Sequence, residues 1–113
     1  MILNKDVLVC VFLLFIAQIV IWFQLNGQVK WDWFKDNYFI MSLMGIPISY
    51  MLLVSTKYGY QGFNELWPTR LLAFATGMIS FPILTYMVLG EGITIKTGIS
   101  ICLAVIIMIL QFI

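Results

Sequence analysis

Four long apolar runs decide what this sequence can fold into, and they cover residues 7–25, 38–56, 66–89 and 95–113. A helix rises about 1.5 Å per residue and the hydrocarbon core of a bilayer is about 30 Å thick, so about 20 apolar residues cross it. Each run is continuous rather than alternating, and the chain is too short to close a barrel. We therefore predict an all-α membrane protein, a four-transmembrane-helix bundle that forms a single membrane domain over residues 1–113.

The composition supports a lipid environment. Hydrophobic residues make up 63% of the 113 residues and charged residues 10%, against about 25% charged in soluble domains. The charges are six Lys and Arg against five Asp and Glu, with no His and no basic stretch, so nucleic-acid binding is excluded. The first apolar run offers no small-x-small cleavage site and should remain as a membrane helix. We expect a multi-pass protein of a cell inner membrane or plasma membrane.

Short connectors separate the runs. Residues 28–36 mix charges with two Trp and one Phe, the aromatic residues that settle at the headgroup level. Residues 57–64 contain two Gly and two Tyr and are expected to turn, with Asn64 a candidate cap for the third helix and Pro68 in its first turn. Residues 90–94 make the last turn.

The charges do not specify an orientation. With both termini on one side, three basic residues fall on each face: Lys5, Lys57 and Arg70 against Lys30, Lys35 and Lys96. Because the Lys and Arg bias sets membrane orientation, either dual insertion or an orientation fixed by a partner is open, with the α-amino group of Met1 tipping the balance slightly inward. Cys10 and Cys102 should lie near opposite faces, too far apart for a disulfide within one subunit.

Small residues form stripes at which helices can approach closely. One stripe is Ala73, Gly77 and Ser80 in the third run, and another is Gly98 with Cys102 in the fourth. Both packing within the chain and a dimer interface are open for these stripes.

The residues needed for catalysis are missing. There is no His, no Cys beside a base and no cluster of metal ligands. Asp32 and Asp36 stand at helical spacing but lie among lysines in the first connector, which is typical of solvated charges. We predict that the protein is not an enzyme and uses no cofactor and no metal.

Gln18 is the largest polar side chain near the middle of an apolar run. Polar groups inside a membrane are costly, so its amide must find a partner. It either contacts a substrate or ion in a central cavity or forms an interhelical hydrogen bond worth about 1 kcal/mol. Phe15 and Trp22 share its helix face, and this spacing suits an organic cation or an apolar ligand but is more often typical of plain packing.

Two further residues in the third run stand out. Arg70 lies about one turn inside it, where a long basic side chain either snorkels to the interface or binds an anionic headgroup or substrate. Pro82 removes a backbone donor, leaves the carbonyl of Met78 without its helical partner and makes a candidate hinge. Glu91, at the membrane edge, is expected to be a solvated loop charge.

The second half of the sequence resembles a known family. Residues 82–94 (PILTYMVLGEGIT) and Gly98 look like the end of a unit of the drug/metabolite transporter (DMT) superfamily, in which a proline-containing helix runs into Leu-Gly-Glu, a short turn and a last helix with an early Gly. The resemblance is loose over most of the chain and specific only from Pro82 onward. It implies the four-helix fold and, from the similar small multidrug resistance (SMR) proteins, a homodimer that is often antiparallel.

Two residues that the resemblance would require are replaced. SMR proteins use a membrane-embedded glutamate in the first helix for proton and cation exchange, and the matching position is Gln18, whose amide cannot carry the proton. Their third-helix tryptophan falls near Ala73. The resemblance therefore implies a scaffold without proton-coupled drug efflux.

We expect a dimeric transporter-like protein that binds or moves a small neutral or amphipathic solute in a cavity lined by Gln18, Trp22, Tyr50 and Tyr86. The alternative is a non-transporting membrane subunit that supports assembly or lipid handling in a larger complex. A water-accessible Gln18 would favour transport, and an apolar, small-residue helix face left free would favour the subunit.

Overall fold

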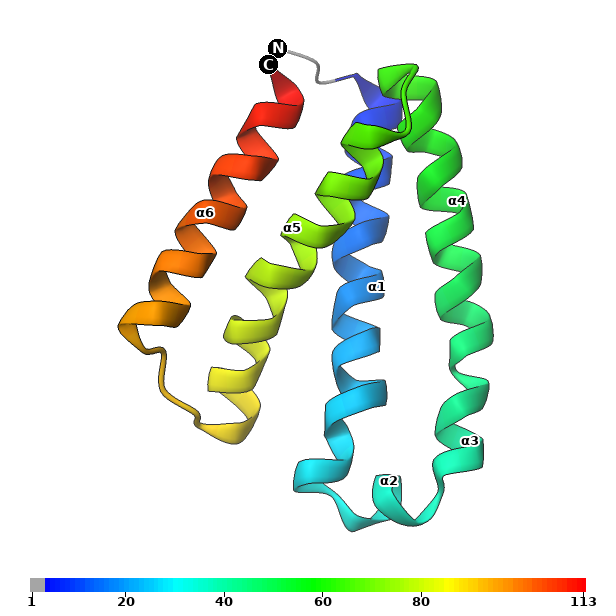
Figure 1. The fold of residues 1–113 in the computed structure, drawn as a ribbon. Coiled ribbons are helices and arrows are strands. Elements are labelled where there is room, and N and C mark those ends of the chain that lie inside the picture. Colours follow the sequence, from blue (N-terminus) through cyan, green and yellow to red (C-terminus); the bar gives the residue numbers. More distant parts are fainter. Residues whose placement is uncertain (1–3) are drawn as a thin grey trace.

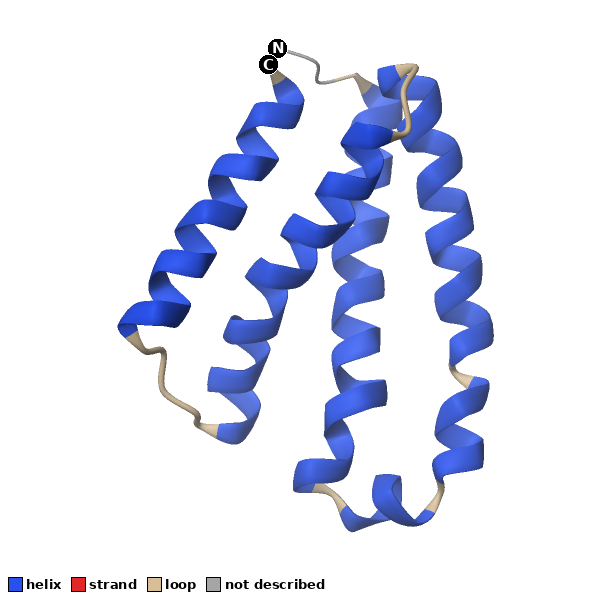
Figure 2. Cartoon of the chain, in the orientation of Figure 1, coloured by secondary structure: helices blue, strands red, loops and turns tan. Residues whose placement is uncertain are grey.

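The computed structural model describes residues 4–113, so Met1 and its α-amino group lie outside the described residues. All regular structure in this range is helical: α1 (Lys5–Lys30), α2 (Asp32–Asp36), α3 (Tyr38–Leu43), α4 (Gly45–Phe63), α5 (Trp67–Leu84), the π-helix η1 (Thr85–Leu89) and α6 (Ile95–Phe112). Short loops join them (Figure 2). Four segments are long and apolar enough to cross a membrane, which are α1, α3 with α4, α5 with η1, and α6. The predicted four-helix membrane fold is confirmed.

The helices pack in the spatial order α4, α1, α5, α6 (Figure 1). Helix α1 contacts both α4 and α5, whereas α6 packs against α5 and lies at one edge of the molecule. The start of α1 and the end of α6 lie at the same end of the molecule as the α4–α5 turn, as predicted. Within α6 only Ala104 is buried.

Polar side chains begin two of the helices. Asn4 caps α1, where Asn4 Oδ1 accepts the backbone N–H of Val7 at 3.0 Å. Thr94 caps α6, where Thr94 Oγ1 accepts the N–H of Thr97 at 3.3 Å. Each cap satisfies a backbone donor that the first helical turn leaves without a partner.

The second connector was wrongly predicted. Residues 57–64 do not form a turn, because α4 continues through Phe63 and includes the Tyr58-Gly59-Tyr60 segment. Asn64 ends α4 rather than capping α5: its φ is 60° and its N–H donates to the carbonyl of Tyr60 at 2.8 Å. Leu66 is the N-cap of α5 and makes no side-chain cap. Pro68 does lie in the first turn of α5, as predicted.

Gly59 has a packing role within this helical segment. It is buried where α4, α1 and α5 converge, and a Cβ placed there would collide with Oγ1 of Thr69 and lie 3.0 Å from Sγ of Cys10. Thr69 Oγ1 is buried and has no hydrogen-bond partner in the described chain. The glycine is therefore a point of close helix approach rather than a turn residue.

The second span contains a break at Met44, between α3 and α4. Pro47, three residues later, has no N–H, and its ring excludes the carbonyl of Leu43 from a regular helix. Leu43 is the last residue of α3. The first connector is also more helical than predicted, because α1 extends to Lys30 and α2 follows almost at once.

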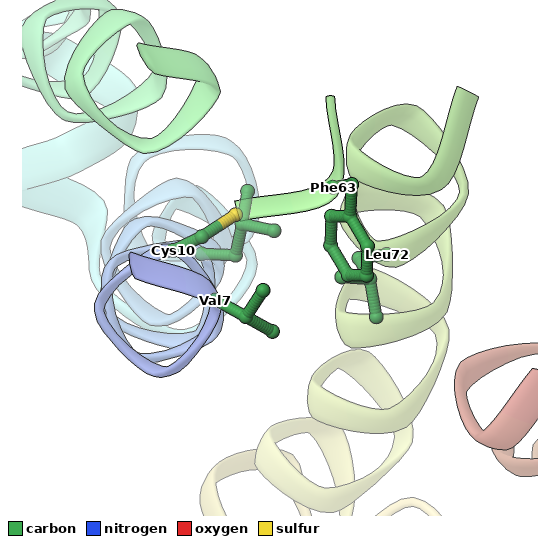
Figure 3. Packing of buried hydrophobic residues seen from close by; sticks show 5 residues of the cluster. Val7, Cys10, Phe63 and Leu72 are labelled. Carbon is green, nitrogen blue, oxygen red and sulfur yellow. The ribbon is translucent and has the colours of Figure 1, made fainter. Parts of the chain in front are cut away.

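A small apolar core lies at the end of the molecule that holds the α4–α5 turn. It comprises Val7, Cys10, Leu14, Phe63 and Leu72 (Figure 3). Cys10 lies 3.7 Å from Oγ of Ser55 on α4 and is buried, whereas Cys102 is exposed on α6. Both cysteines are free, as the predicted separation requires.

Candidate functional site

Gln18 lies in α1 and faces α5. Its Nε2 donates to the backbone carbonyl of Ala73 at 3.1 Å, and its amide lies over Gly77, where a Cβ would be 3.0 Å from Oε1. The predicted interhelical hydrogen bond is therefore present. The stripe of Ala73, Gly77 and the buried Ser80 serves packing within the chain. In the fourth run, no atom lies within 4 Å of a Cβ placed on Gly98, so that stripe lacks such a contact in the described chain.

Gln18 also lines two cavities. One has a volume of about 390 Å³ and lies against Leu52, Arg70 and Phe74. The other has about 140 Å³ and lies against Trp22, Asn26, Gly77 and Phe81. Gln18 is half-buried and lines both cavities together with Ile21, so its amide is the polar group that the two spaces share at membrane depth.

A third cavity continues this series. It has about 430 Å³ and lies between α5, η1, the 90–94 connector and α6. Phe81 lines both this cavity and the smaller one beside Gln18. We call these three spaces the cavity row; their shared wall residues are Gln18, Ile21 and Phe81.

The cavity row follows one face of α5. Nine residues of this span line the row, and five of them stand at spacings of three or four residues: Arg70, Phe74, Gly77, Phe81 and Thr85. Leu71, Ala73, Met78 and Pro82 flank these five. Residues at these spacings share a helix face. The rise from the first to the last is about 22 Å, most of the roughly 30 Å hydrocarbon core. The row therefore follows α5 through most of the membrane.

Trp22 fixes the wall between two of these cavities. Its side chain is 2% exposed, and Nε1 donates to Oγ1 of Thr85 at 3.0 Å. Trp22 lines the cavity beside Gln18, and Thr85 lines the cavity beside α6. This hydrogen bond joins α1 to the π-helical end of the third span.

The two tyrosines expected in the same cavity lie elsewhere. Tyr50 is 69% exposed and Tyr86 57% exposed, and neither lines a cavity of the row. The structure therefore brings together Gln18 and Trp22 but not the predicted set of four. The tyrosines were placed by depth along their helices, and depth does not fix the direction in which a side chain points.

Arg70 and Pro82 lie at opposite parts of α5. Arg70 is exposed near the α4–α5 turn and lines two neighbouring cavities, one of them in the row. Pro82 is buried, lines the third cavity and is followed three residues later by η1. Helix α5 continues through Pro82 to Leu84, and the hydrogen bonding becomes π-helical at Thr85. Whether Pro82 is a hinge stays a prediction.

The polar wall of the third cavity is not predicted by the sequence pattern. Glu91, Lys96, Thr97 and Ser100 line it together with Met78, Phe81 and Ile93. From the sequence we expect Glu91 to be only a solvated loop charge. Lys96 matters there only as one of the three basic residues on its membrane face. Glu91 lies within the short 90–94 connector and Lys96 in the first turn of α6, a closeness in sequence that could have placed them at one site.

Residues 4–113 contain no group of three or more His, Cys, Asp or Glu side chains that could hold a metal ion. Neither a protein-family model, nor a curated protein, nor a solved structure matches the chain. The resemblance to the DMT superfamily therefore rests on residues 82–98 and stays a prediction.

Proposed function

We propose that this integral membrane protein is transporter-like and moves a small neutral or amphipathic solute along the cavity row. The observation that carries the proposal is the row itself, a series of three cavities along α5 that is lined by Arg70 near one membrane face and by Glu91 and Lys96 near the other. Intramembrane polar residues mark solute pathways when they face a cavity rather than lipid.

The polar groups along the row favour a solute without a large net charge. At membrane depth the row offers the Gln18 amide and the Thr85 hydroxyl, and neither carries a charge. The charged side chains stand toward its two ends. An amide is neither protonated nor ionised near neutral pH, so transport would not use a carboxylate proton switch in α1. No catalytic step is part of this proposal.

A homodimer in the cell inner membrane or plasma membrane is the proposed functional form. Helix α6 packs against α5 and buries only Ala104 within the chain. An antiparallel dimer would fit the balanced basic residues, because neither insertion is favoured by their count.

The exposed face of α6 also favours the second candidate, a non-transporting membrane subunit. An apolar helix with one buried residue can pack against a larger complex as well as against lipid or a second copy. Water access to Gln18 separates the two candidates, because only transport requires it.

The direct test is transport by Gln18→Ala in liposomes. A thermal-shift screen of the purified protein with uncharged and zwitterionic amphiphiles first selects the solute. We expect Gln18→Ala to reduce uptake at least tenfold, because the shared polar contact of two cavities is lost, while the protein elutes at the wild-type size.

The matched control is Gln111→Ala. Gln111 lies in α6 and donates to its own helix at the carbonyl of Ile107. This variant should transport as the wild type does. Equal uptake by Gln18→Ala and wild type would contradict the proposed path, and loss of the fold in Gln18→Ala would assign Gln18 a structural role alone.

A further inference from the structure

The cavity between α5 and α6 points to a particular class of ligand. We infer that it binds a zwitterionic amphiphile, with the headgroup between Glu91 and Lys96 and the apolar chain against Met78 and Phe81. This inference rests on the proposed function and names the solute class that would enter or leave the row at this end.

Two opposite charges line one space without pairing with each other. Glu91 and Lys96 both line the cavity of about 430 Å³. The described residues contain no ion pair between them, and both side chains are exposed. Each charge is therefore free to meet the opposite charge of a ligand.

Hydroxyl groups extend the polar part of this wall. Thr97 and Ser100 line the cavity from the first turns of α6, on the same side as Lys96. Oγ of Ser100 donates to the carbonyl of Lys96 at 2.9 Å, and its oxygen still has acceptor capacity. An ammonium would be placed at Glu91, and a phosphate or carboxylate at Lys96.

The opposite part of the cavity is apolar. Met78, Phe81 and Pro82 come from α5, and Phe81 is also the wall toward Gln18. A methionine and an aromatic ring suit an alkyl chain, and the thioether adapts to its shape. Glu91 and Lys96 stand at the connector end of the cavity together with the apolar Ile93, and Met78 and Phe81 stand deeper along α5. This order matches a headgroup with a chain and does not match a small ion.

Net charge decides against simpler ligands. A purely anionic ligand at Lys96 would also face the carboxylate of Glu91, and a purely cationic ligand at Glu91 would face the ammonium of Lys96. A ligand charge is repelled by a side chain of the same sign that lines the same cavity. A zwitterion satisfies both groups at once, whether it is a phospholipid of the bilayer or a soluble amphiphile.

Binding of four defined compounds tests the chemistry. The probes are lysophosphatidylcholine, its headgroup glycerophosphocholine, the anionic lysophosphatidylglycerol and an uncharged monoacylglycerol, added to the purified full chain in an uncharged detergent and counted by native mass spectrometry. We expect lysophosphatidylcholine to bind most tightly and its chainless headgroup at least tenfold more weakly. A preference for the chainless headgroup would overturn the assignment of an amphiphile, and tighter binding of the anionic or uncharged lipid would overturn the assignment of a zwitterion.

Variants locate the site. Glu91→Gln and Lys96→Gln should each weaken binding of lysophosphatidylcholine about fivefold, the upper range for an exposed ion pair. Asp36→Asn and Lys35→Gln are matched controls, because these exposed charges belong to α2 on the same membrane face and do not line the cavity. Unchanged binding in both cavity variants, or an equal loss in the controls, would overturn the assignment.

Failure of this inference is distinct from failure of the proposed function. If Gln18→Ala abolishes uptake but the Glu91 and Lys96 variants bind lysophosphatidylcholine as the wild type does, the proposed path is supported and the proposed headgroup site is wrong. If the Glu91 and Lys96 variants bind lysophosphatidylcholine more weakly but the wild-type protein moves no solute into liposomes, the headgroup site is supported and the proposed transport is wrong.

Discussion

Gly59→Ala is expected to lower the free energy of unfolding by about 1–3 kcal/mol, the usual cost of overpacking a close contact. The added Cβ would meet Oγ1 of Thr69 and would lie 2.9 Å from Cγ2 of Thr69 and 3.0 Å from Sγ of Cys10. These atoms belong to α5 and α1, so the methyl group would separate three helices at once. Equilibrium unfolding of the purified protein in mixed micelles, followed by tryptophan fluorescence, measures the change.

Gly98→Ala is the matched control for this prediction. Gly98 also lies within a helix, but no atom lies within 4 Å of its added Cβ. Alanine favours a helix by about 1 kcal/mol over glycine, so this variant should be as stable as the wild type or more stable. Equal destabilisation of the two variants would mean that Gly59 is not a point of helix contact.

Trp22→Ala is expected to lower the free energy of unfolding by about 3 kcal/mol, the lower end for removal of a buried Trp. The side chain is 2% exposed, and its loss leaves a void at the α1–α5 contact as well as the Thr85 hydroxyl without its donor. We expect the lower end of this range because the side chain stays in apolar surroundings when the helices separate within the micelle.

The hydrogen bond can be separated from the packing. A double-mutant cycle of Trp22→Phe and Thr85→Val should give a coupling of about 0.6 kcal/mol, the average for interhelical bonds in a membrane. Trp33→Ala in α2 is the control, because Trp33 is 55% exposed, and it should change stability little. A Trp22→Ala variant as stable as Trp33→Ala would contradict the buried position of Trp22.

The sequence predicts the spans well because a single physical length governs them. Each apolar run must cross the hydrocarbon core, and all four predicted runs fall within observed helices or end within a residue of them. The boundaries are less predictable. Gly59 and Gly62 look like turn residues by composition, but with Ser55 they repeat at helical spacing, and that stripe indicates helix contact.

The contacts of a single side chain are predictable where apolar surroundings require its polar group to form a hydrogen bond. Gln18 had to find a partner in apolar surroundings, and it did. That its acceptor is Ala73 depends on how α5 is placed against α1, which one sequence does not specify. The directions of the Tyr50 and Tyr86 side chains depend in the same way on helix rotation. Glu91 and Lys96 become candidate binding residues only because α6 packs against α5 and both side chains line the cavity between these helices.

Water access to the cavity row is the most direct measure of the central claim. Single cysteines replace Phe74 and Phe81 in the row, and Phe12 and Leu53 outside it, in a Cys10→Ala, Cys102→Ala background. All four native side chains are at least half exposed, with values of 56%, 50%, 66% and 71%, so exposure alone does not separate the pairs. Reaction with a charged, membrane-impermeant thiol reagent is then measured in liposomes. A solute path predicts that the cysteines at Phe74 and Phe81 react while those at Phe12 and Leu53 stay protected by lipid; equal protection of all four would contradict it.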